Sequence, residues 1–292
     1  MILVTGASGQ LGRRIVQWLS VRLPEGGAGQ LAVSVRDPER VADFAARGIE
    51  VRHGNFDRRE TLSAAFAGVE RLVLVSTDGP EDVGIARHRN AIEAAMAAGV
   101  RRVCYTSFLD ADAKSPSAFA RVHAAAEADL AASGLACTVL RNGLYGDFLP
   151  MKFAAALRTG VLRLPAGDGK VSYLSRNELA EAIAAAAVAP RLEKQTYELT
   201  GQTAHDYRDL VARVAAAVGK TLRYEAVPTG AAVEAFEAGD VPAATARTLA
   251  TLYVSIAGNR LARTTTDFAA LVGHPPKSVD CLVAEFFRAP RP

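Results

Sequence analysis

Residues Ile2 to Gly12 read Ile-Leu-Val-Thr-Gly-Ala-Ser-Gly-Gln-Leu-Gly, and they carry the strongest fold signal in the sequence. Its first four residues are aliphatic or β-branched and predict a buried strand from Ile2 to Thr5. Three glycines follow in a G-x-x-G-x-x-G pattern, and an amphipathic helix begins in the residues Arg13 to Trp18. A glycine-rich turn between a first strand and a first helix presents backbone N–H groups and the positive end of the helix dipole to a phosphate.

The three glycines have separate expected tasks. Gly6 permits the tight exit from the strand, Gly9 lets the backbone approach a pyrophosphate without a Cβ in the way, and Gly12 lets the helix pack close to the sheet. The alternative is a structural turn that binds no ligand. We predict that a dinucleotide pyrophosphate lies on Gly6, Ala7, Ser8, Gly9, Gln10, Leu11 and Gly12.

Outward from this turn, short β-branched runs alternate with Ala-rich helical stretches, a rhythm typical of repeated βαβ units. The predicted strands are Ile2 to Thr5, Leu31 to Val35, Glu50 to His53, Arg71 to Val75, Arg102 to Thr106 and Ala136 to Leu140. The predicted helices between them are Leu11 to Arg22, Arg40 to Arg47, Arg59 to Phe66, Gly84 to Ala98 and Ser117 to Ser133. The fold class predicted is α/β: a Rossmann-type, doubly wound parallel sheet of six strands with helices on both faces.

The rhythm breaks after Leu140, where glycines and prolines crowd together. We expect a Rossmann domain over residues 1–145 and a smaller C-terminal substrate-side α/β region over residues 146–292, interleaved with the first as one compact unit. Later helices are predicted at Arg176 to Val188, His205 to Val218, Ala231 to Ala238 and Ala243 to Ala257, with strands at Thr196 to Leu199 and Leu222 to Ala226.

Composition narrows the class of protein. The formal charge is +3 over 292 residues, and no Lys/Arg block resembles a nucleic-acid patch, so no nucleic-acid partner is expected. No apolar run is long enough to span a membrane, and the chain opens on a strand pattern instead of a signal peptide. The three cysteines, Cys104, Cys137 and Cys281, are too scattered to predict a disulfide framework or a metal site. We expect a cytoplasmic protein, monomeric or homodimeric.

The end of the second predicted strand should decide between NADH and NADPH. An acidic side chain there accepts from a 2′-hydroxyl, whereas an arginine pairs with a 2′-phosphate. The sequence offers both, but Asp37 is explained as the helix cap before Pro38, so Arg36 favours NADPH over NADH. A solvated Arg36 is the alternative.

Other polar residues follow the third, fourth and fifth predicted strands. Asn55, Phe56 and Asp57 are placed to flank the adenine, although Asp57 could equally cap the next helix. Ser76, Thr77 and Ser107 lie at the same crevice edge and could contact ribose, or each could serve only as a helix cap.

Many short-chain dehydrogenases use a Tyr followed four residues later by Lys, which share a helix face as proton donor and pKa-lowering cation. None of the seven tyrosines here has Lys at that spacing. The helix after the fifth strand carries Phe119 and His123 in those places, with Glu127 one turn further along. The Tyr acid is therefore absent.

These features together resemble the NmrA-like atypical short-chain dehydrogenases, and within them most of all the NAD(P)H:quinone oxidoreductases that lack the Tyr-Lys pair. The resemblance runs over almost the whole chain. It is carried by the glycine pattern, Arg36, His88-Arg89-Asn90, Tyr105-Thr106-Ser107, His123 with Glu127, Leu140 to Tyr145, and a final segment from Phe268 to Pro275.

The resemblance implies roles for four further residues. His123 occupies the family's lysine position and would hydrogen-bond the nicotinamide ribose, unless it is only a helix-surface imidazole. Asn142, Gly143 and Tyr145 would line the nicotinamide and substrate end, with an ordinary loop and a buried tyrosine as the competing interpretation.

The expected activity is hydride transfer from NADPH to a small-molecule acceptor, a quinone or a similar electrophile. Addition of hydride to a quinone gives a stabilised hydroquinone anion that solvent can protonate, so the absent Tyr matters less than it would for a ketone. Catalysis should then come largely from proximity and orientation. One alternative is a non-enzymatic NADP(H)-binding redox sensor of the NmrA type, and another is a related NADPH reductase of azo dyes, triphenylmethane dyes or phenylpropanoids.

Overall fold

The computed structural model describes residues 1–24, 27–77 and 79–287. A seven-stranded, wholly parallel sheet forms its centre, in the strand order β10-β6-β5-β4-β1-β2-β3. The strands are β1 (Ile2–Thr5), β2 (Leu31–Val35), β3 (Glu50–His53), β4 (Arg71–Leu74), β5 (Arg102–Phe108), β6 (Ala136–Asn142) and β10 (Thr196–Leu199). The predicted Rossmann-type fold class is confirmed.

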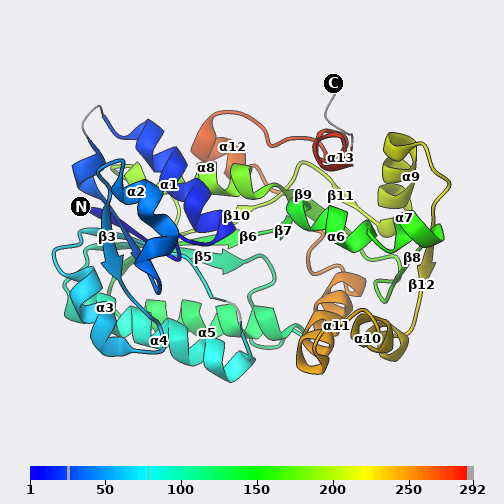
Figure 1. The fold of residues 1–292 in the computed structure, drawn as a ribbon, viewed down its shortest axis with the longest axis horizontal. Helices are drawn as coiled ribbons and strands as arrows, with labels where there is room; N and C mark the ends of the chain where they lie inside the picture. The colour runs from blue at the N-terminus through cyan, green and yellow to red at the C-terminus, as the bar shows by residue number, and fades with distance from the viewer. Residues whose placement is uncertain (25–26, 78, 288–292) are drawn as a thin grey trace.

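Helices cover both faces of the sheet (Figure 1). On one face α8 (Arg176–Val188) packs along α1 (Gln10–Arg22), over strand side chains such as Val4 and Val33. On the other face lie α3 (Arg59–Phe66), α4 (Glu81–Ala97) and α5 (Ala118–Ala132), which pack over Leu3 and Val103. Successive strand residues therefore face opposite helix layers. Apolar side chains on both faces explain why β1, β2 and β4 are almost continuous hydrophobic runs, whereas the edge strand β3 is Glu-Val-Arg-His.

The six-strand prediction was one strand short. β10 pairs in parallel with β6, Thr196 opposite Val139, although about 50 residues separate the two strands in the chain. The helix expected from Arg40 to Arg47 is instead a 3₁₀ turn, Pro38–Val41, followed by the short α2 (Ala42–Ala45). α4 begins earlier than expected, at Glu81, because Pro80 precedes it and two acids in its first turn suit a helix N-terminus.

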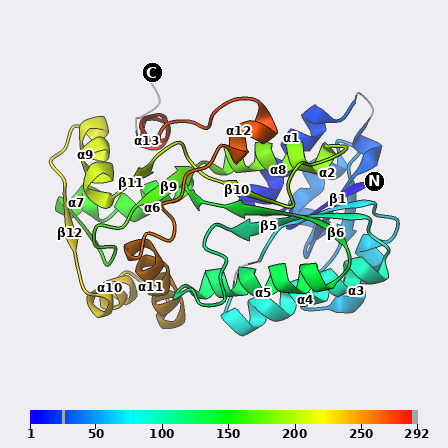
Figure 2. The ribbon, with the colours of Figure 1, turned by 180° about the vertical axis from the view of Figure 1, so that it is seen from behind.

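The remaining residues build a second layered region around its own apolar core, seen at the far end of the sheet from β3 (Figures 1 and 2). Its strands are β7 (Leu144–Tyr145), β8 (Val161–Leu164), β9 (Val171–Leu174), β11 (Ala204–His205) and β12 (Arg223–Ala226). Its helices, with the turns that lead into them, include η3 (Gly146–Phe148), α6 (Leu149–Phe153), α7 (Ala156–Thr159), α9 (Tyr207–Val218), α10 (Thr229–Glu237), α11 (Ala243–Ala257) and α13 (Val279–Phe287). A 3₁₀ turn, η1 (Gly27–Gln30), precedes β2, and α12 (Asp267–Val272) packs beside α8 and β10. Among the described residues, no helix has the length and apolar character to cross a bilayer.

The strand order fixes where a ligand can bind. The chain runs outward from β1 to β3 on one side and from β4 to β10 on the other, so β1 and β4 lie at the point where the winding direction reverses. In open α/β sheets, ligands bind beyond the carboxyl ends of the strands at such a point.

Candidate functional site

The glycine turn leaves the carboxyl end of β1 at this reversal point. Gly6 has a φ of +60°, a left-handed conformation that glycine adopts without strain, and its N–H donates to the Ser34 carbonyl oxygen at 3.0 Å. The Gly9 N–H donates to the Gly6 carbonyl oxygen at 2.9 Å and closes the turn. A Cβ at Gly12 would lie 2.4 Å from that same oxygen, so only glycine fits where α1 meets the turn.

The amino end of α1 is open to an anion. Gly9 precedes the helix, and within the described chain no side chain caps it and no acid lies in the first turn. Gly6, Gly9 and Gln10 are exposed and Ser8 is half-buried, whereas Ala7 and Leu11 point their side chains into the core. The turn therefore offers backbone N–H groups, the arrangement that binds phosphate at helix N-termini.

At the end of β2, Asp37 and Arg36 have separate positions. The Asp37 carboxylate accepts from the Glu39 N–H at 3.2 Å, so the predicted cap is confirmed. Arg36 is exposed at the strand end. The Arg87 hydrogen bond, and to a smaller extent the Arg36 charge, hold the pKa of Asp57 below its usual value.

The segment after β3 is ordered by its own polar contacts. Asp57 forms an ion pair with Arg87 of α4, Nε to Oδ1 at 2.7 Å, and Arg58 rather than Asp57 precedes α3. The Asn55 side chain accepts from the Asp57 N–H at 3.0 Å, and the Phe56 carbonyl accepts from Asn90 at 2.9 Å. Sequence reasoning missed Arg87, because its partner lies 30 residues away in a loop.

Ser76 and Thr77 follow β4, next to the glycine turn. The Ser76 N–H donates to Thr106 Oγ1 at 2.9 Å, and the Thr77 N–H lies 3.4 Å from His88 Nε2. Pro80 precedes α4, so neither residue caps that helix. Backbone bonds to neighbouring elements thus hold this strand end in place.

His123 lies among other rings, not on an open helix surface. Its Nδ1 lies 2.8 Å from the Tyr105 hydroxyl, and the centroids of the His88 and Phe108 rings are each 6.0 Å from its own. Burial, followed by the nearby His88, lowers the pKa of His123 to about 3. Burial likewise lowers the pKa of His88 to about 4. Both imidazoles are therefore neutral near pH 7.

Ser107 and Glu127 form a second polar pair beside His123. The buried Ser107 hydroxyl donates to Glu127 Oε1 at 2.6 Å, and the Arg141 guanidinium donates two hydrogen bonds, of 2.9 and 2.6 Å, to the same carboxylate. Ser117, not Ser107, precedes α5. The Glu127 carboxylate therefore ties α5 to β5 and β6, and Ser107 is engaged within the protein.

Asn142 ends β6 with its side-chain amide buried. Its exposed fraction is 2%, and neither amide atom has a hydrogen-bond partner among the described residues. Each buried polar atom left unpaired costs on the order of 1–3 kcal/mol, so the amide suits a polar ligand group. Next to it, the Gly143 N–H donates to the Leu199 carbonyl at 2.8 Å, and a Cβ there would lie 3.1 Å from that oxygen.

Tyr145 packs in a stack at the start of the second region. Its ring is nearly parallel to Phe148, at 7° and 5.8 Å between centroids. The Arg176 guanidinium lies over both rings, 5.0 Å from Tyr145 and 4.3 Å from Phe148. Asp147 accepts from the Arg176 N–H at 2.7 Å and lies 3.9 Å from Arg14 of α1, which brings this stack to the glycine-turn side of the sheet.

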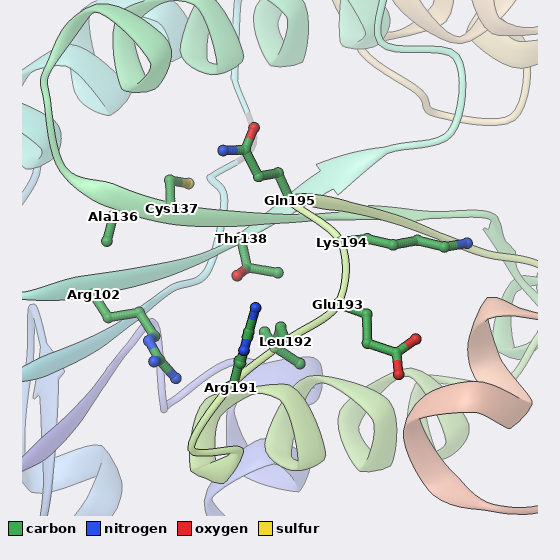
Figure 3. Close-up of a pocket in the computed structure, with 9 residues that line it drawn as sticks. All are labelled: Arg102, Ala136, Cys137, Thr138, Arg191, Leu192, Glu193, Lys194 and Gln195. Carbon is green, nitrogen blue, oxygen red and sulfur yellow. The ribbon is translucent and has the colours of Figure 1, made fainter.

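The predicted site residues therefore share the carboxyl edge of the sheet or border it. A dinucleotide fits two observations there: a turn where a Cβ would collide with backbone, and a buried amide with no partner among the described residues. A separate hollow lies at the opposite edge, between the start of β6 and the segment before β10 (Figure 3). Its lining includes Arg102, Thr138 and Gln195, none of them a predicted site residue.

Comparison with known proteins supports a dinucleotide site at the carboxyl edge of the sheet. Quinone oxidoreductase 2 of Escherichia coli is 35% identical over 289 residues, which cover 98% of this chain and 99% of that protein. The structure of NADPH-dependent quinone oxidoreductase from Escherichia coli complexed with NADPH superposes with a TM-score of 0.92, at 34% identity and with coverage of 99% and 100%. The structure of Citrobacter sp. triphenylmethane reductase complexed with NADP(H) superposes with a TM-score of 0.91, at 31% identity and with coverage of 98% and 100%.

The family itself matches by sequence. The NmrA-like family covers residues 1–261, a span that contains every predicted site residue from Gly6 to Tyr145. The chain therefore belongs to the NmrA-like family, and the resemblance predicted from its sequence is confirmed.

Proposed function

We propose that the protein is an NADPH-dependent oxidoreductase that transfers hydride to a quinone or a similar electrophilic acceptor. The observation that carries this proposal is the open glycine turn at the reversal point of the sheet, where Gly12 meets the Gly6 carbonyl too closely for any side chain. The names of the relatives, a quinone oxidoreductase and a triphenylmethane reductase, support the choice of acceptor class.

The proposed cofactor contacts follow the carboxyl edge of the sheet. Backbone N–H groups of residues 6–12 would bind the pyrophosphate, and Arg36 the 2′-phosphate. Asn55, Phe56 and Asp57 would border the adenine, and Ser76, Thr77 and Ser107 the ribose side. Arg36 is exposed and its neighbour Asp57 is already paired with Arg87, so a net positive charge remains for a phosphate.

At the reactive end, His123 would donate to the nicotinamide ribose, and Asn142, Gly143 and Tyr145 would enclose the nicotinamide and the acceptor. Bound NADPH supplies the hydride. The residues of this chain position the reactants and keep the site polar at one buried amide and one neutral imidazole.

The proton that completes the reduction would come from solvent. The Tyr105 phenol is fully buried, and burial raises its pKa well above the ordinary value, so it is a poor acid. A quinone accepts hydride to give a hydroquinone anion, and water then protonates that anion. A ketone would give a far more basic alkoxide, so alcohol and ketone chemistry is disfavoured.

The test is consumption of NADPH and NADH by purified protein over a panel of quinones, with an azo dye and a simple ketone for comparison. We expect steady NADPH oxidation with benzoquinone, slower NADH oxidation and no ketone reduction. A protein that binds NADPH yet reduces no acceptor would exclude the enzyme. That outcome would favour a redox sensor, which should distinguish NADPH from NADP⁺ in affinity.

A further inference from the structure

The hydroxyl of Tyr105 has one hydrogen-bond partner among the described residues, Nδ1 of His123 at 2.8 Å. Tyr105 lies on β5 with no exposed surface, and its ring makes a T-shaped contact with the His88 ring, 5.6 Å between centroids. Burial raises the pKa of the Tyr105 phenol well above its usual value, with the Glu127 charge adding to the effect. The phenol is therefore protonated and has one O–H to donate.

This bond decides which nitrogen of His123 carries the proton. A neutral imidazole has one donor nitrogen and one acceptor nitrogen. If Nδ1 carried the proton, it would donate to the phenol oxygen, and the phenol hydrogen would be buried without an acceptor. Since an unsatisfied buried donor is costly, the phenol donates, Nδ1 accepts and the imidazole hydrogen lies on Nε2.

We propose that Tyr105 is a positioning residue, whose hydroxyl holds His123 in the Nε2–H tautomer so that His123 presents one hydrogen-bond donor to the bound ligand. No residue of the described ranges accepts from Nε2. Whether Nε2 faces a ribose hydroxyl or an oxygen of the molecule that receives hydride depends on the proposed function. The assignment of the tautomer does not depend on it.

One consequence concerns proton transfer. In this form the Nδ1 lone pair of His123 accepts from the Tyr105 hydroxyl and Nε2 carries a single N–H donor, so His123 orients a ligand without acting as a base. Tyr105 takes no proton from the ligand, because its own oxygen is turned to His123. Hydrogen bonding to the neutral form of an imidazole also opposes its protonation.

The direct test is the imidazole spectrum of the ligand-free protein labelled with nitrogen-15. Two-bond proton–nitrogen correlations distinguish a hydrogen-free ring nitrogen from an N–H nitrogen, and the His123→Gln variant identifies the His123 signals among the five histidines. We expect Nδ1 to be hydrogen-free and Nε2 to carry hydrogen from about pH 5 to pH 8. A hydrogen on Nδ1, or an imidazolium in that range, would overturn the proposal.

The Tyr105→Phe variant tests the positioning role. It keeps the ring and removes the hydroxyl, so the His123 signals should become a mixture of tautomers. NADPH affinity should fall about two- to tenfold, the range that one ordinary hydrogen bond commands.

Tyr197→Phe is the matched control. Tyr197 lies on β10 and is also buried. Its hydroxyl accepts from the N–H groups of Glu193 and Lys194, in the segment before β10, so its loss should leave His123 unchanged. If Tyr105→Phe retains a single Nε2–H tautomer, the positioning role is wrong. If Tyr105→Phe does not fold, the wild-type spectrum alone decides the tautomer.

The two proposals fail in different experiments. Failure of the proposed function would appear as absent NADPH oxidation and would leave the imidazole spectrum as expected. Failure of the tautomer inference would appear in that spectrum even when NADPH oxidation is normal.

Discussion

Replacement of Gly12 by Ala tests the glycine turn at its tightest point. A Cβ at this position would lie 2.4 Å from the Gly6 carbonyl oxygen and 2.8 Å from the Gly6 carbonyl carbon, both backbone atoms that cannot rotate away. To reach the 3.0 Å below which real contacts are essentially never found, α1 and the turn must separate by about 0.6 Å. The Gly6 carbonyl also accepts from Gly9, so the whole turn moves.

The magnitude follows from that displacement. A shift of this size should break at least one backbone hydrogen bond to the pyrophosphate. A hydrogen bond to a charged group contributes about 1.5–3 kcal/mol, so NADPH binding should weaken by about tenfold or more. The unfolding free energy should fall as well, by about 1–3 kcal/mol, as in other overpacked sites. Affinity is therefore measured by fluorescence titration at a temperature where the variant is folded by circular dichroism.

Gly230→Ala is the matched control. Gly230 lies in the first turn of α10, where an added Cβ would have no heavy atom of the described chain within 4 Å, so alanine should be neutral or slightly stabilising there. A Gly12→Ala protein that binds NADPH as tightly as wild type would show that the pyrophosphate does not lie on this turn.

Three further predictions concern selectivity, an unpaired amide and pH. Arg36→Ala should weaken NADPH binding by about 10- to 100-fold, the range of a charge-assisted hydrogen bond, and leave the affinity for NADH unchanged. Arg47→Ala, at another exposed arginine, should change neither affinity. An equal loss of affinity for both cofactors would contradict the 2′-phosphate assignment. Asn142→Leu should raise the thermal stability of the ligand-free protein, because it removes a buried amide without a partner among the described residues. The same variant should reduce the increase in thermal stability that NADPH adds. If NADPH stabilises the variant as much as wild type, Asn142 does not contact the cofactor. The pKa values of His88 and His123 are about 4 and about 3, below the value near 6.5 that a histidine has in the unfolded chain. As the pH falls below about 6.5, the unfolded chain therefore binds more protons than the folded protein. The unfolding free energy should drop between about pH 6.5 and pH 4, by up to about 1.4 kcal/mol per pH unit for each histidine. Urea unfolding should show a shallower pH dependence in His123→Gln, and an unchanged slope would mean that the imidazole is solvated.

The parts of the fold that local pattern controls could be predicted. β1 and β2 match their predicted limits because each is a short apolar or β-branched run, and β3, whose sequence is the mixed Glu-Val-Arg-His, also matches its predicted limits. β10 was recognised as a strand, but its place beside β6 depends on a pairing across about 50 residues. The two-residue strands β7 and β11 have no periodicity from which to predict them.

The site, like the fold, has features that follow from local sequence and features that depend on contacts between distant segments. The glycine turn and the Asp37 cap have local sequence signals, and both have the expected geometry. The Tyr105–His123 bond and the Asp57–Arg87 pair join elements 18 and 30 residues apart, so they depend on how α5 and α4 lie against the sheet. The assignment of each residue to a part of the cofactor stays a prediction.

Calorimetric titration of the wild-type protein with NADPH, and separately with NADH, shows whether the glycine turn belongs to a nicotinamide-coenzyme site. We expect a saturable heat with one NADPH per chain and weaker binding of NADH. An absence of heat for both coenzymes at millimolar concentration would contradict that assignment.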